Sequence, residues 1–362
     1  MWHNLKLLFF PFIPVFLTAC AVDVHSSKEV HNLEKSLADV FYLACLAPSA
    51  HNTQMYSVVI YTDSNKVKIS LDDSRLLKVA DPFKREALIS LGAYVRALET
   101  AYLAYGYKTE TVVKESSIFL TYTKQPHALD EAKKNNLLTL MQKRHTNKRE
   151  FKRDCIEPKV LNEISSSFPS TQYLANNSSD YEFFKEIFIK AFTEQAYNHS
   201  VANELSSWMR FSDSEAKAHK DGLPAEQLGI TGVKKFFYYA FMDHDSVATD
   251  SFAKKSIEIA KAQALHCAGY LVIKSKSDNF KELIETGKTA YDLMLYLTEH
   301  NLAIQPLSAA LEEPHTRELL AYKLNTKDKL QMILRLGYVD DYGKNYKIRR
   351  DLHDYIKVES SQ

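Results

Sequence analysis

The chain has 362 residues, of which 45% are hydrophobic and 25% are charged, so it can bury the core of one or two globular domains. The formal net charge of +1 excludes the strong basic excess that is typical of a nucleic-acid-binding surface. With only ten prolines, nine glycines and no low-complexity tract, the sequence also excludes a long flexible linker.

The N-terminus carries an apolar run, residues 7–19, which follows Lys6 and ends immediately before Cys20. Its length suits the core of a signal peptide and is too short to span a bilayer. Pro11 and Pro14 also disfavour a stable spanning helix. The ending Leu-Thr-Ala-Cys resembles a bacterial lipobox, in which the chain is cleaved before a cysteine that then receives lipid.

That resemblance implies a leader at residues 1–19, a lipid anchor on Cys20 and a polar tether at residues 20–32. Ala21, in place of an aspartate, implies an envelope protein of the outer membrane that faces the periplasm. A plain secretory leader with an unrelated cysteine remains the alternative. The other cysteines, Cys45, Cys155 and Cys267, are scattered without a CxxC pair, so we expect neither a disulfide framework nor a metal site.

The first part of the mature chain shows helical spacing up to Pro48, then alternating strand patterns and a second helix. These elements are expected at residues 33–47, 56–61, 67–71, 81–104 and 117–123. The later part reads mostly as helices, with strands near its end. Helices are expected at 129–143, 157–167, 181–209, 251–267 and 283–299, and strands at 270–273 and 330–336. Residues 213–232 read as irregular.

A weak internal repeat relates the two parts. Residues 91–107 and 286–302 each contain a glycine-started helix with apolar residues at helical spacing, followed by a short turn. The repeat places Gly92 on Gly287. Such a pattern is common among helices, so its meaning depends on the motifs around it.

Several short motifs occur in an order that resembles one family. Residues 47–54 read APSAHNTQ, 144–151 read RHTNKREF, and the chain later has LGY at 336–338 and KIRRDL at 347–352. Together they resemble the nitroreductase-like FMN flavoproteins. Residues 81–86 (DPFKRE) and 305–308 (QPLS) resemble the duplicated, single-chain Acg-like subgroup. The matches extend from about residue 35 to residue 355.

The resemblance implies an α+β fold with a mixed, largely antiparallel sheet wrapped by helices, duplicated as an intramolecular pseudo-dimer. The implied halves are residues 33–128 and 129–355, the second with a helical insertion at about 181–241. A further oligomer is not required. Trp208, Arg210 and the turn at 221–224 are candidate lid features of that insertion, although helix packing and a plain turn explain them as well.

The residues also suit a flavin phosphate. Arg144 and Lys148 flank Thr146, which gives two cations and a hydroxyl group within five residues. A solvated run of charges is the alternative for this segment alone. His51 is expected to be a packed or surface histidine, and we assign it no role. The implied cofactor-binding residues are Pro48, Ser49, Asn52, Arg144, His145, Thr146, Lys148, Pro306, Leu307, Ser308, Lys347 and Arg349.

In dimeric members of the family, one subunit supplies the arginine-containing start and the basic tail, and the other supplies the Pro-Ser and Asn loop. Here the intact loop belongs to the first half, and the start and tail belong to the second. Residues 168–172 look like a remnant of a second loop that lacks the asparagine. The sequence therefore predicts one composite site and one FMN per chain.

The leading function is an FMN-dependent two-electron reduction of a small organic substrate, with NAD(P)H as the donor. No side-chain nucleophile or acid is required, because the chemistry takes place on the flavin. The alternative is a lipoprotein that binds or sequesters FMN without turnover, and scarce NAD(P)H outside the cytoplasm favours it. A third hypothesis is a structural lipoprotein with an inactive site. The presence of the phosphate-binding residues argues against it.

Overall fold

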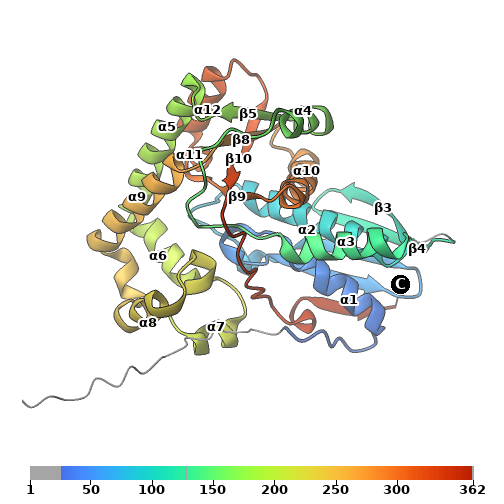
Figure 1. The fold of residues 1–362 in the computed structure, drawn as a ribbon. Helices are drawn as coiled ribbons and strands as arrows, with labels where there is room; N and C mark the ends of the chain where they lie inside the picture. Colours follow the sequence, from blue (N-terminus) through green and yellow to red (C-terminus); the bar gives the residue numbers. More distant parts are fainter. Residues whose placement is uncertain (1–25, 127–128, 361–362) are drawn as a thin grey trace, which may run out of the picture.

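The computed structural model describes residues 26–126 and 129–360. The expected leader and Cys20 therefore lie outside the described residues. Two β-sheets and a set of helices form an α+β fold, as the sequence predicted (Figure 1). Within the described ranges, no helix is both long enough and apolar enough to cross a membrane.

The helices fall into two groups, those that pack on the sheets and those that form one long insertion. The first group comprises α1 (Lys35–Ala44), α2 (Arg85–Ala104), α3 (Glu131–Lys143), α4 (Pro158–Ser167), α10 (Phe280–Glu299), α11 (Ala309–Glu312) and α12 (Pro314–Lys323). The insertion comprises α5 (Ser179–Ala196), α6 (His199–Trp208), α7 (Asp213–His219), α8 (Gly232–Phe241) and α9 (Asp250–Leu265).

Both large sheets repeat one strand order. The first sheet contains β1 (Tyr56–Tyr61), β2 (Lys66–Leu71), β4 (Ser117–Lys124) and β3 (Tyr107–Lys114), in that spatial order. The second contains β5 (Thr171–Ala175), β8 (Gly269–Ser275), β10 (Lys329–Tyr338) and β9 (Leu302–Pro306). In each sheet the fourth strand along the chain pairs between the second and the third, and all these pairs are antiparallel.

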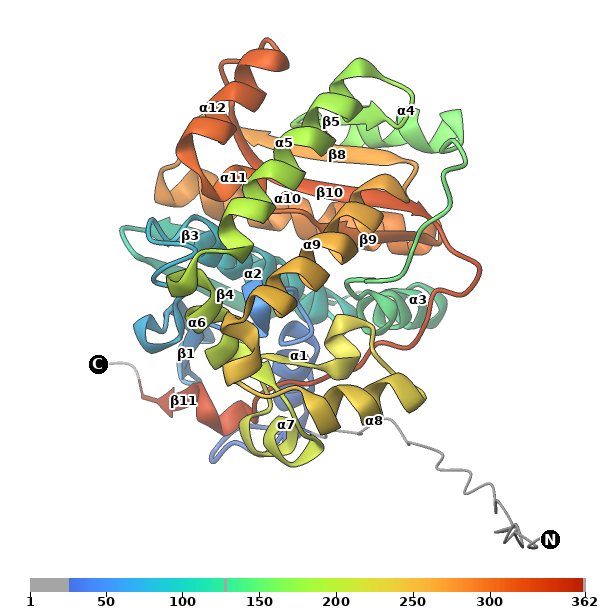
Figure 2. The ribbon, with the colours of Figure 1, turned by 90° about the vertical axis from the view of Figure 1, so that its left-hand side faces the viewer.

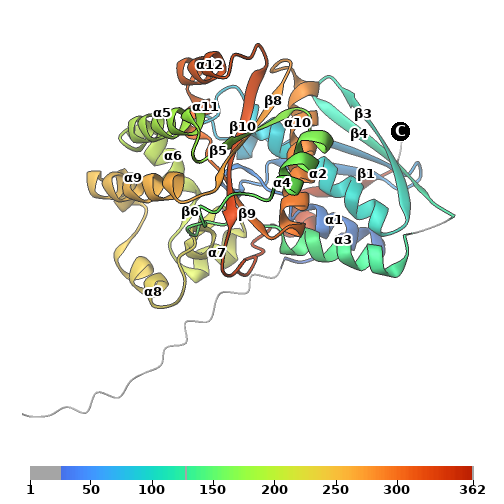
Figure 3. The ribbon, with the colours of Figure 1, turned by 45° about the horizontal axis from the view of Figure 1, so that its top comes forward.

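Helices α2 and α10 lie between the two sheets, each against its own (Figure 3). Their crossing is closed by two glycines. A Cβ atom on Gly92 would lie 2.1 Å from the Ile284 carbonyl oxygen, and one on Gly287 would lie 2.0 Å from the Ile89 carbonyl oxygen. The contacts are reciprocal, since Gly92 and Gly287 occupy matching positions of the sequence repeat, as do Ile89 and Ile284. Only glycine permits the two backbones to approach this closely.

The insertion leaves the second half between β5 and β8 and covers the outer face of the second sheet (Figure 2). It also contains the short parallel pair β6 (Met209–Arg210) and β7 (Leu223–Pro224), followed by a 3₁₀ turn, η3 (Ala225–Leu228). After β10 the chain crosses to the first half. There β11 (Ile356–Glu359) pairs in parallel with β1, so the first sheet is mixed.

Two of the expected helices were wrong at their boundaries. The helix expected from residue 81 begins at Arg85, because Lys84 takes a left-handed conformation with φ 58°. The helix expected over 181–209 is two helices. Its break is at Asn198, whose side chain accepts hydrogen bonds from the first turn of α6. The region expected to be irregular contains α7 and η3.

In the two large sheets, the sequence prediction missed four strands, β3, β5, β9 and β11. Each of these segments is short or alternates charged and small residues, so its intrinsic strand propensity is weak. Whether such a segment forms a strand depends on its pairing with neighbouring strands. The proposed loop remnant at 168–172 ends in β5, which begins at Thr171. Cys45 and Cys267 are buried, as expected of small apolar side chains, whereas the thiol of Cys155 is exposed.

Candidate functional site

The loop after α1 is the most conformationally unusual segment near the predicted site. Pro48 prevents α1 from continuing, and the chain forms a 3₁₀ turn, η1 (Ala50–Asn52). His51, Asn52 and Gln54 all have positive φ values, between 46° and 52°. A left-handed conformation is costly for residues other than glycine, and such strain clusters at functional sites. The Ser49 hydroxyl group accepts a hydrogen bond from the Gln54 backbone at 3.2 Å and closes the loop.

Asn52 ties three distant segments together. Its side-chain amide donates to the carbonyl oxygens of Gly222 at 3.1 Å and Ile348 at 3.2 Å. Gly222 belongs to the insertion and Ile348 to the C-terminal tail. The residue is 7% exposed, so these bonds are shielded from water. Asn52 therefore holds the loop against the insertion and the tail.

Arg144 directly follows α3 and is only 2% exposed. One guanidinium nitrogen, Nη2, donates to the Leu46 carbonyl oxygen at 2.6 Å. The other two, Nε and Nη1, are buried and have no hydrogen-bond partner among residues 26–126 and 129–360. Burial lowers the pKa of Arg144 to about 10. The side chain is therefore a buried cation with two nitrogen donors that bond to nothing in the described chain. It lies at the buried boundary between the end of α1 and the segment after α3, which is called the seam below.

Arg349 approaches the same place from the C-terminal tail. Its guanidinium group donates to the backbone carbonyl oxygens of Cys45, Leu46, Ala47 and Ile348. Both arginines thus bond to the Leu46 carbonyl oxygen at the end of α1. The C-terminal tail and the segment after α3 therefore both contact the end of α1 at this point.

The rest of the segment after Arg144 runs beside β9, where the Asn147 N–H donates to the Ile304 carbonyl oxygen at 2.9 Å. The His145 ring lies edge-on to Tyr342 with its Nδ1 2.9 Å from the Lys143 carbonyl oxygen, and burial lowers its pKa. Thr146 is partly buried. These placements leave His145 turned toward the tail.

Lys148 is a second cation whose charge is not balanced by a nearby anion in the described chain. Within the described parts of the chain its ammonium group has no ion-pair or hydrogen-bond partner, and it is partly buried. Burial, reinforced by the nearby Arg335, lowers its pKa to about 8. Its charge also reaches His51, whose pKa burial lowers to about 4, so His51 is neutral. The charge of the segment after Arg144 therefore acts on the loop after α1.

Lys347 does not join this cluster. Its ammonium group donates to the Gln142 side-chain oxygen at 3.2 Å on α3. The tail residue that enters the seam is Arg349, two residues further on.

Pro306, Leu307 and Ser308 form the end of β9 and the turn into α11. Pro306 pairs with Leu334, and the buried Leu307 donates its N–H to the Ile333 carbonyl oxygen at 2.9 Å. Ser308 lies within hydrogen-bonding reach of the carboxyl groups of Glu86 and Glu312. Burial raises the pKa of both carboxyl groups, and their mutual repulsion adds to the effect at Glu312.

The candidate lid features of the insertion hold the fold together. Arg210 is 4% exposed and forms an ion pair with Asp221 at 2.5 Å. Arg75 of the first half bonds to the same carboxylate and lies over the Trp208 ring. These contacts favour a structural role in packing the insertion for Arg210 and Trp208, rather than a role in a lid.

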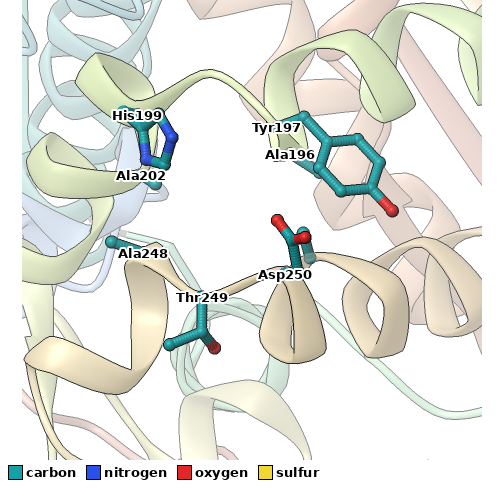
Figure 4. Close-up of a pocket in the computed structure, with 8 residues that line it drawn as sticks. Ala196, Tyr197, His199, Ala202, Ala248, Thr249 and Asp250 are labelled. Carbon is teal, nitrogen blue, oxygen red and sulfur yellow. The ribbon is translucent and has the colours of Figure 1, made fainter.

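A shallow hollow with a volume of only about 10 Å³ lies between the α5–α6 junction and the start of α9, lined by Tyr197, His199, Thr249 and Asp250 among others (Figure 4). It contains none of the predicted site residues. Ligand pockets usually enclose about 300–1,000 Å³, so the hollow is too small for a flavin. Among the described residues, no group of three or more His, Cys, Asp and Glu side chains is placed to hold a metal ion.

The structure thus brings Arg144, Arg349, Lys148 and the loop at 48–52 to one seam, and it places Ser308 beside two carboxyl groups. It leaves Lys347 outside. His51, Glu86 and Glu312 were not singled out from the sequence as site residues. For His51, a signal was present in its position between Ser49 and Asn52, but a left-handed backbone conformation at histidine cannot be read from residue type.

No protein-family model and no curated protein matches the chain. Among solved structures, the chain is similar to the FMN-dependent nitroreductase NfnB from Mycobacterium smegmatis in complex with NADPH, at 17% identity and a TM-score of 0.38, over 59% of this chain and 90% of that one. It is also similar to the FMN and NADPH-dependent nitroreductase NfnB from Sphigopyxis sp. strain HMH, at 14% identity and a TM-score of 0.33, over 56% and 87%. These scores are too low to place the chain in a family.

Proposed function

We propose that the chain binds one FMN at the seam between its halves and acts as an FMN-dependent oxidoreductase on a small organic substrate. The observation that carries this proposal is Arg144, a buried guanidinium group with two unpartnered donors. Leaving buried polar groups unpaired is costly, and proteins rarely do so without a ligand or a functional reason. The missing partner is an anion.

A flavin phosphate would supply the anionic partner that Arg144 lacks in the seam. It is a compact dianion, and Arg144 supplies the charge-assisted donors that such a group prefers. Lys148 offers a second uncompensated cation, whose charge reaches His51 in the loop after α1. Arg349 already bonds to four carbonyl oxygens, so its contribution is the positive field and the position of the tail.

The composite nature of the site follows from an intramolecular pseudo-dimer. The shared strand order of the two sheets and the reciprocal contacts of Gly92 and Gly287 support an approximate two-fold relation between the halves. Loop and basic residues from different halves then form one site. In the second half, the segment equivalent to the loop after α1 runs into strand β5 and has no residues with positive φ values. In this proposal, only one of the two possible sites is therefore complete.

When bound, FMN supplies two-electron chemistry that amino-acid side chains lack. The chain's residues position and tune it. The loop at 49–54 is held rigid by Asn52 and Gln54 and presents the Ser49 segment to the seam. Burial and the neighbouring Glu86 raise the pKa of Glu312 to about 8, so Glu312 retains a proton near neutral pH beside Ser308. A proton held there is available to a reduced substrate.

An FMN-binding lipoprotein without turnover is the second candidate. The sequence feature that favours it is the lipobox-like ending at Cys20, since a periplasmic protein has little access to NAD(P)H. Both candidates require the same flavin site.

The test compares FMN with riboflavin, which lacks only the phosphate. Titration of the purified protein, followed by flavin fluorescence, is expected to show a clear preference for FMN. In Arg144→Met, which keeps side-chain bulk without charge, that preference should disappear. Equal affinities for the two flavins in the wild-type protein would contradict the proposal. Anaerobic mixing of the FMN-loaded protein with NADPH then separates an enzyme, whose flavin absorbance bleaches, from a flavin-binding protein.

A further inference from the structure

Helix α8 exposes an apolar stripe that nothing in the described structure covers. Val233, Phe236, Phe237 and Phe241 are 66%, 56%, 53% and 76% exposed. Their spacing follows one side of the helix, and Phe237 stacks on Phe241 with ring centroids 6.2 Å apart. Lys234, also exposed, lies within the same stretch. Three adjacent exposed phenylalanines are unusual on a monomer surface and mark an interaction site.

The opposite side of α8 is firmly attached. Lys235 is 4% exposed and pairs with Glu226 at 2.6 Å and with Asp213 at 2.5 Å. The Tyr239 hydroxyl group accepts a hydrogen bond from the Ala225 N–H at 3.2 Å. These contacts fix the rotation of the helix about its axis. The phenylalanine stripe therefore faces outward as a consequence of the fold.

The described chain begins at the same end of the molecule (Figures 1 and 2). The Ser27 N–H donates to the Asp351 carboxylate, and Lys220 at the end of α7 bonds to that carboxylate at 2.7 Å. Five residues lie between Cys20 and Ser26, and the six steps from one to the other span at most about 20 Å. A lipid on Cys20 would therefore hold this end of the protein close to a bilayer.

We propose that the outer stripe of α8 inserts into the lipid surface as a second membrane contact, beside the anchor. A helix with phenylalanines on one side and lysine on its flank suits the boundary between headgroups and acyl chains. The proposal goes beyond flavin binding and rests on the lipobox interpretation of Cys20. Its consequence is a fixed orientation, with the insertion facing the membrane.

The experiment places a tryptophan on the stripe. Full-length protein carrying Phe237→Trp is reconstituted in vesicles of phosphatidylethanolamine and phosphatidylglycerol, with or without brominated acyl chains. The matched control is Tyr322→Trp on α12, at the opposite end of the molecule, where the native side chain is 85% exposed. The unsubstituted lipidated protein gives the background from Trp208, since cleavage before Cys20 removes Trp2.

Bromine quenches only tryptophans that reach the acyl chains. We expect the signal added by Phe237→Trp to fall by roughly half in brominated vesicles, since such helices sit about 5–10 Å into the boundary region. The signal added by Tyr322→Trp should not change. Equal quenching at both positions, or none at 237, overturns the proposal, as does a concentration-dependent dimer that buries α8. Mass spectrometry of lipid on Cys20 shows separately whether the anchor interpretation holds.

Discussion

The two buried arginines of the seam are alike in burial and different in bonding. Arg144 leaves two donors unused, whereas every nitrogen of Arg349 donates to a backbone carbonyl oxygen. Their substitutions should therefore separate binding from stability. We expect Arg349 to support the fold and Arg144 to bind the proposed ligand.

We expect Arg144→Met to leave the free energy of unfolding unchanged or to raise it by about 1–3 kcal/mol, because unsatisfied buried donors are removed. FMN affinity should fall about ten- to a hundredfold, since a charged hydrogen bond contributes roughly 1.5–3 kcal/mol. Residual binding should be less sensitive to salt. Urea unfolding and flavin titration measure the two effects. A variant that unfolds would show that Arg144 is structural.

The matched variant, Arg349→Met, should behave in the opposite way. It removes the side-chain donor to the carbonyl oxygens of Cys45 and Ala47, whereas that of Leu46 keeps Arg144, so we expect a loss of about 1–3 kcal/mol in the free energy of unfolding. The same urea experiment checks it. If Arg349→Met were as stable as the wild type, the division of roles between the two arginines would be wrong.

If Lys148 contacts the flavin phosphate as proposed, we expect flavin binding to depend on pH. Its folded pKa, lowered to about 8, lies below the unfolded value, so the unfolded chain holds more protons above pH 8 and the unliganded protein gains stability as pH rises. A bound phosphate requires the charged lysine. FMN affinity should thus be flat from pH 7 to about 8 and then fall, by up to about tenfold per pH unit.

Flavin titrations across this pH range measure the effect. The control is Lys148→Met, whose affinity should be lower and should lose the fall above pH 8. A wild-type profile that stays flat to pH 9 would place Lys148 outside the phosphate site.

At the scale of elements, the crossing of α2 and α10 determines how the halves meet. Each glycine lies against the backbone of the opposite helix, and backbone cannot move aside as a flexible side chain can. Because the contacts of the two glycines are reciprocal, equivalent substitutions in α2 and α10 should lower the free energy of unfolding by similar amounts.

We expect Gly92→Ala and Gly287→Ala each to lower the free energy of unfolding by about 1–3 kcal/mol through overpacking, in spite of the gain of about 1 kcal/mol in helix propensity. Urea unfolding midpoints of the two variants, measured side by side, test this. A stabilised variant would mean that the helices are further apart, and strongly unequal losses would count against the two-fold relation.

The loop after α1 shows how elements combine at the site. Its three left-handed residues are held by contacts from the insertion and the tail, since the Asn52 amide bonds to Gly222 and Ile348 and the Gln54 amide bonds to Lys220. The strain is therefore maintained by segments more than 160 positions away in the sequence. No local pattern specifies such a conformation.

For the whole molecule, the composite site predicts one FMN per chain. Reconstituted protein should be yellow and should reach a flavin-to-protein ratio near one, measured from flavin absorbance and amino-acid analysis. A ratio of two would mean that the reciprocal site is functional. A ratio of zero after reconstitution would remove the flavin proposal.

The membrane anchor is a separate prediction. Cys20→Ser removes the proposed lipid attachment, and the apolar run of residues 7–19 is too short to span a bilayer. We therefore expect the variant to leave the membrane fraction in cell fractionation, unlike Ala21→Ser. Retention of an uncleaved Cys20→Ser protein in membranes would contradict the lipobox interpretation.

The sequence by itself located the main helices and the basic segments, because hydrophobic periodicity and proline and glycine positions are local signals. The α+β class came from the family resemblance of its motifs. The sequence also related Gly92 to Gly287. It missed β3, β5, β9 and β11, since the stability of short strands comes from their partners. It assigned Lys347 to the site, although spacing alone cannot tell which tail cation turns inward.

Only the tertiary structure decided which groups meet. The seam between the halves buries Arg144 without a counter-ion, brings Arg349 to the same carbonyl oxygen and sets Lys148 beside His51. The fold also leaves the phenylalanines of α8 uncovered while it buries Lys235 of the same helix. Burial and pairing depend on contacts between distant segments, and these exist only once the two halves and the insertion have packed.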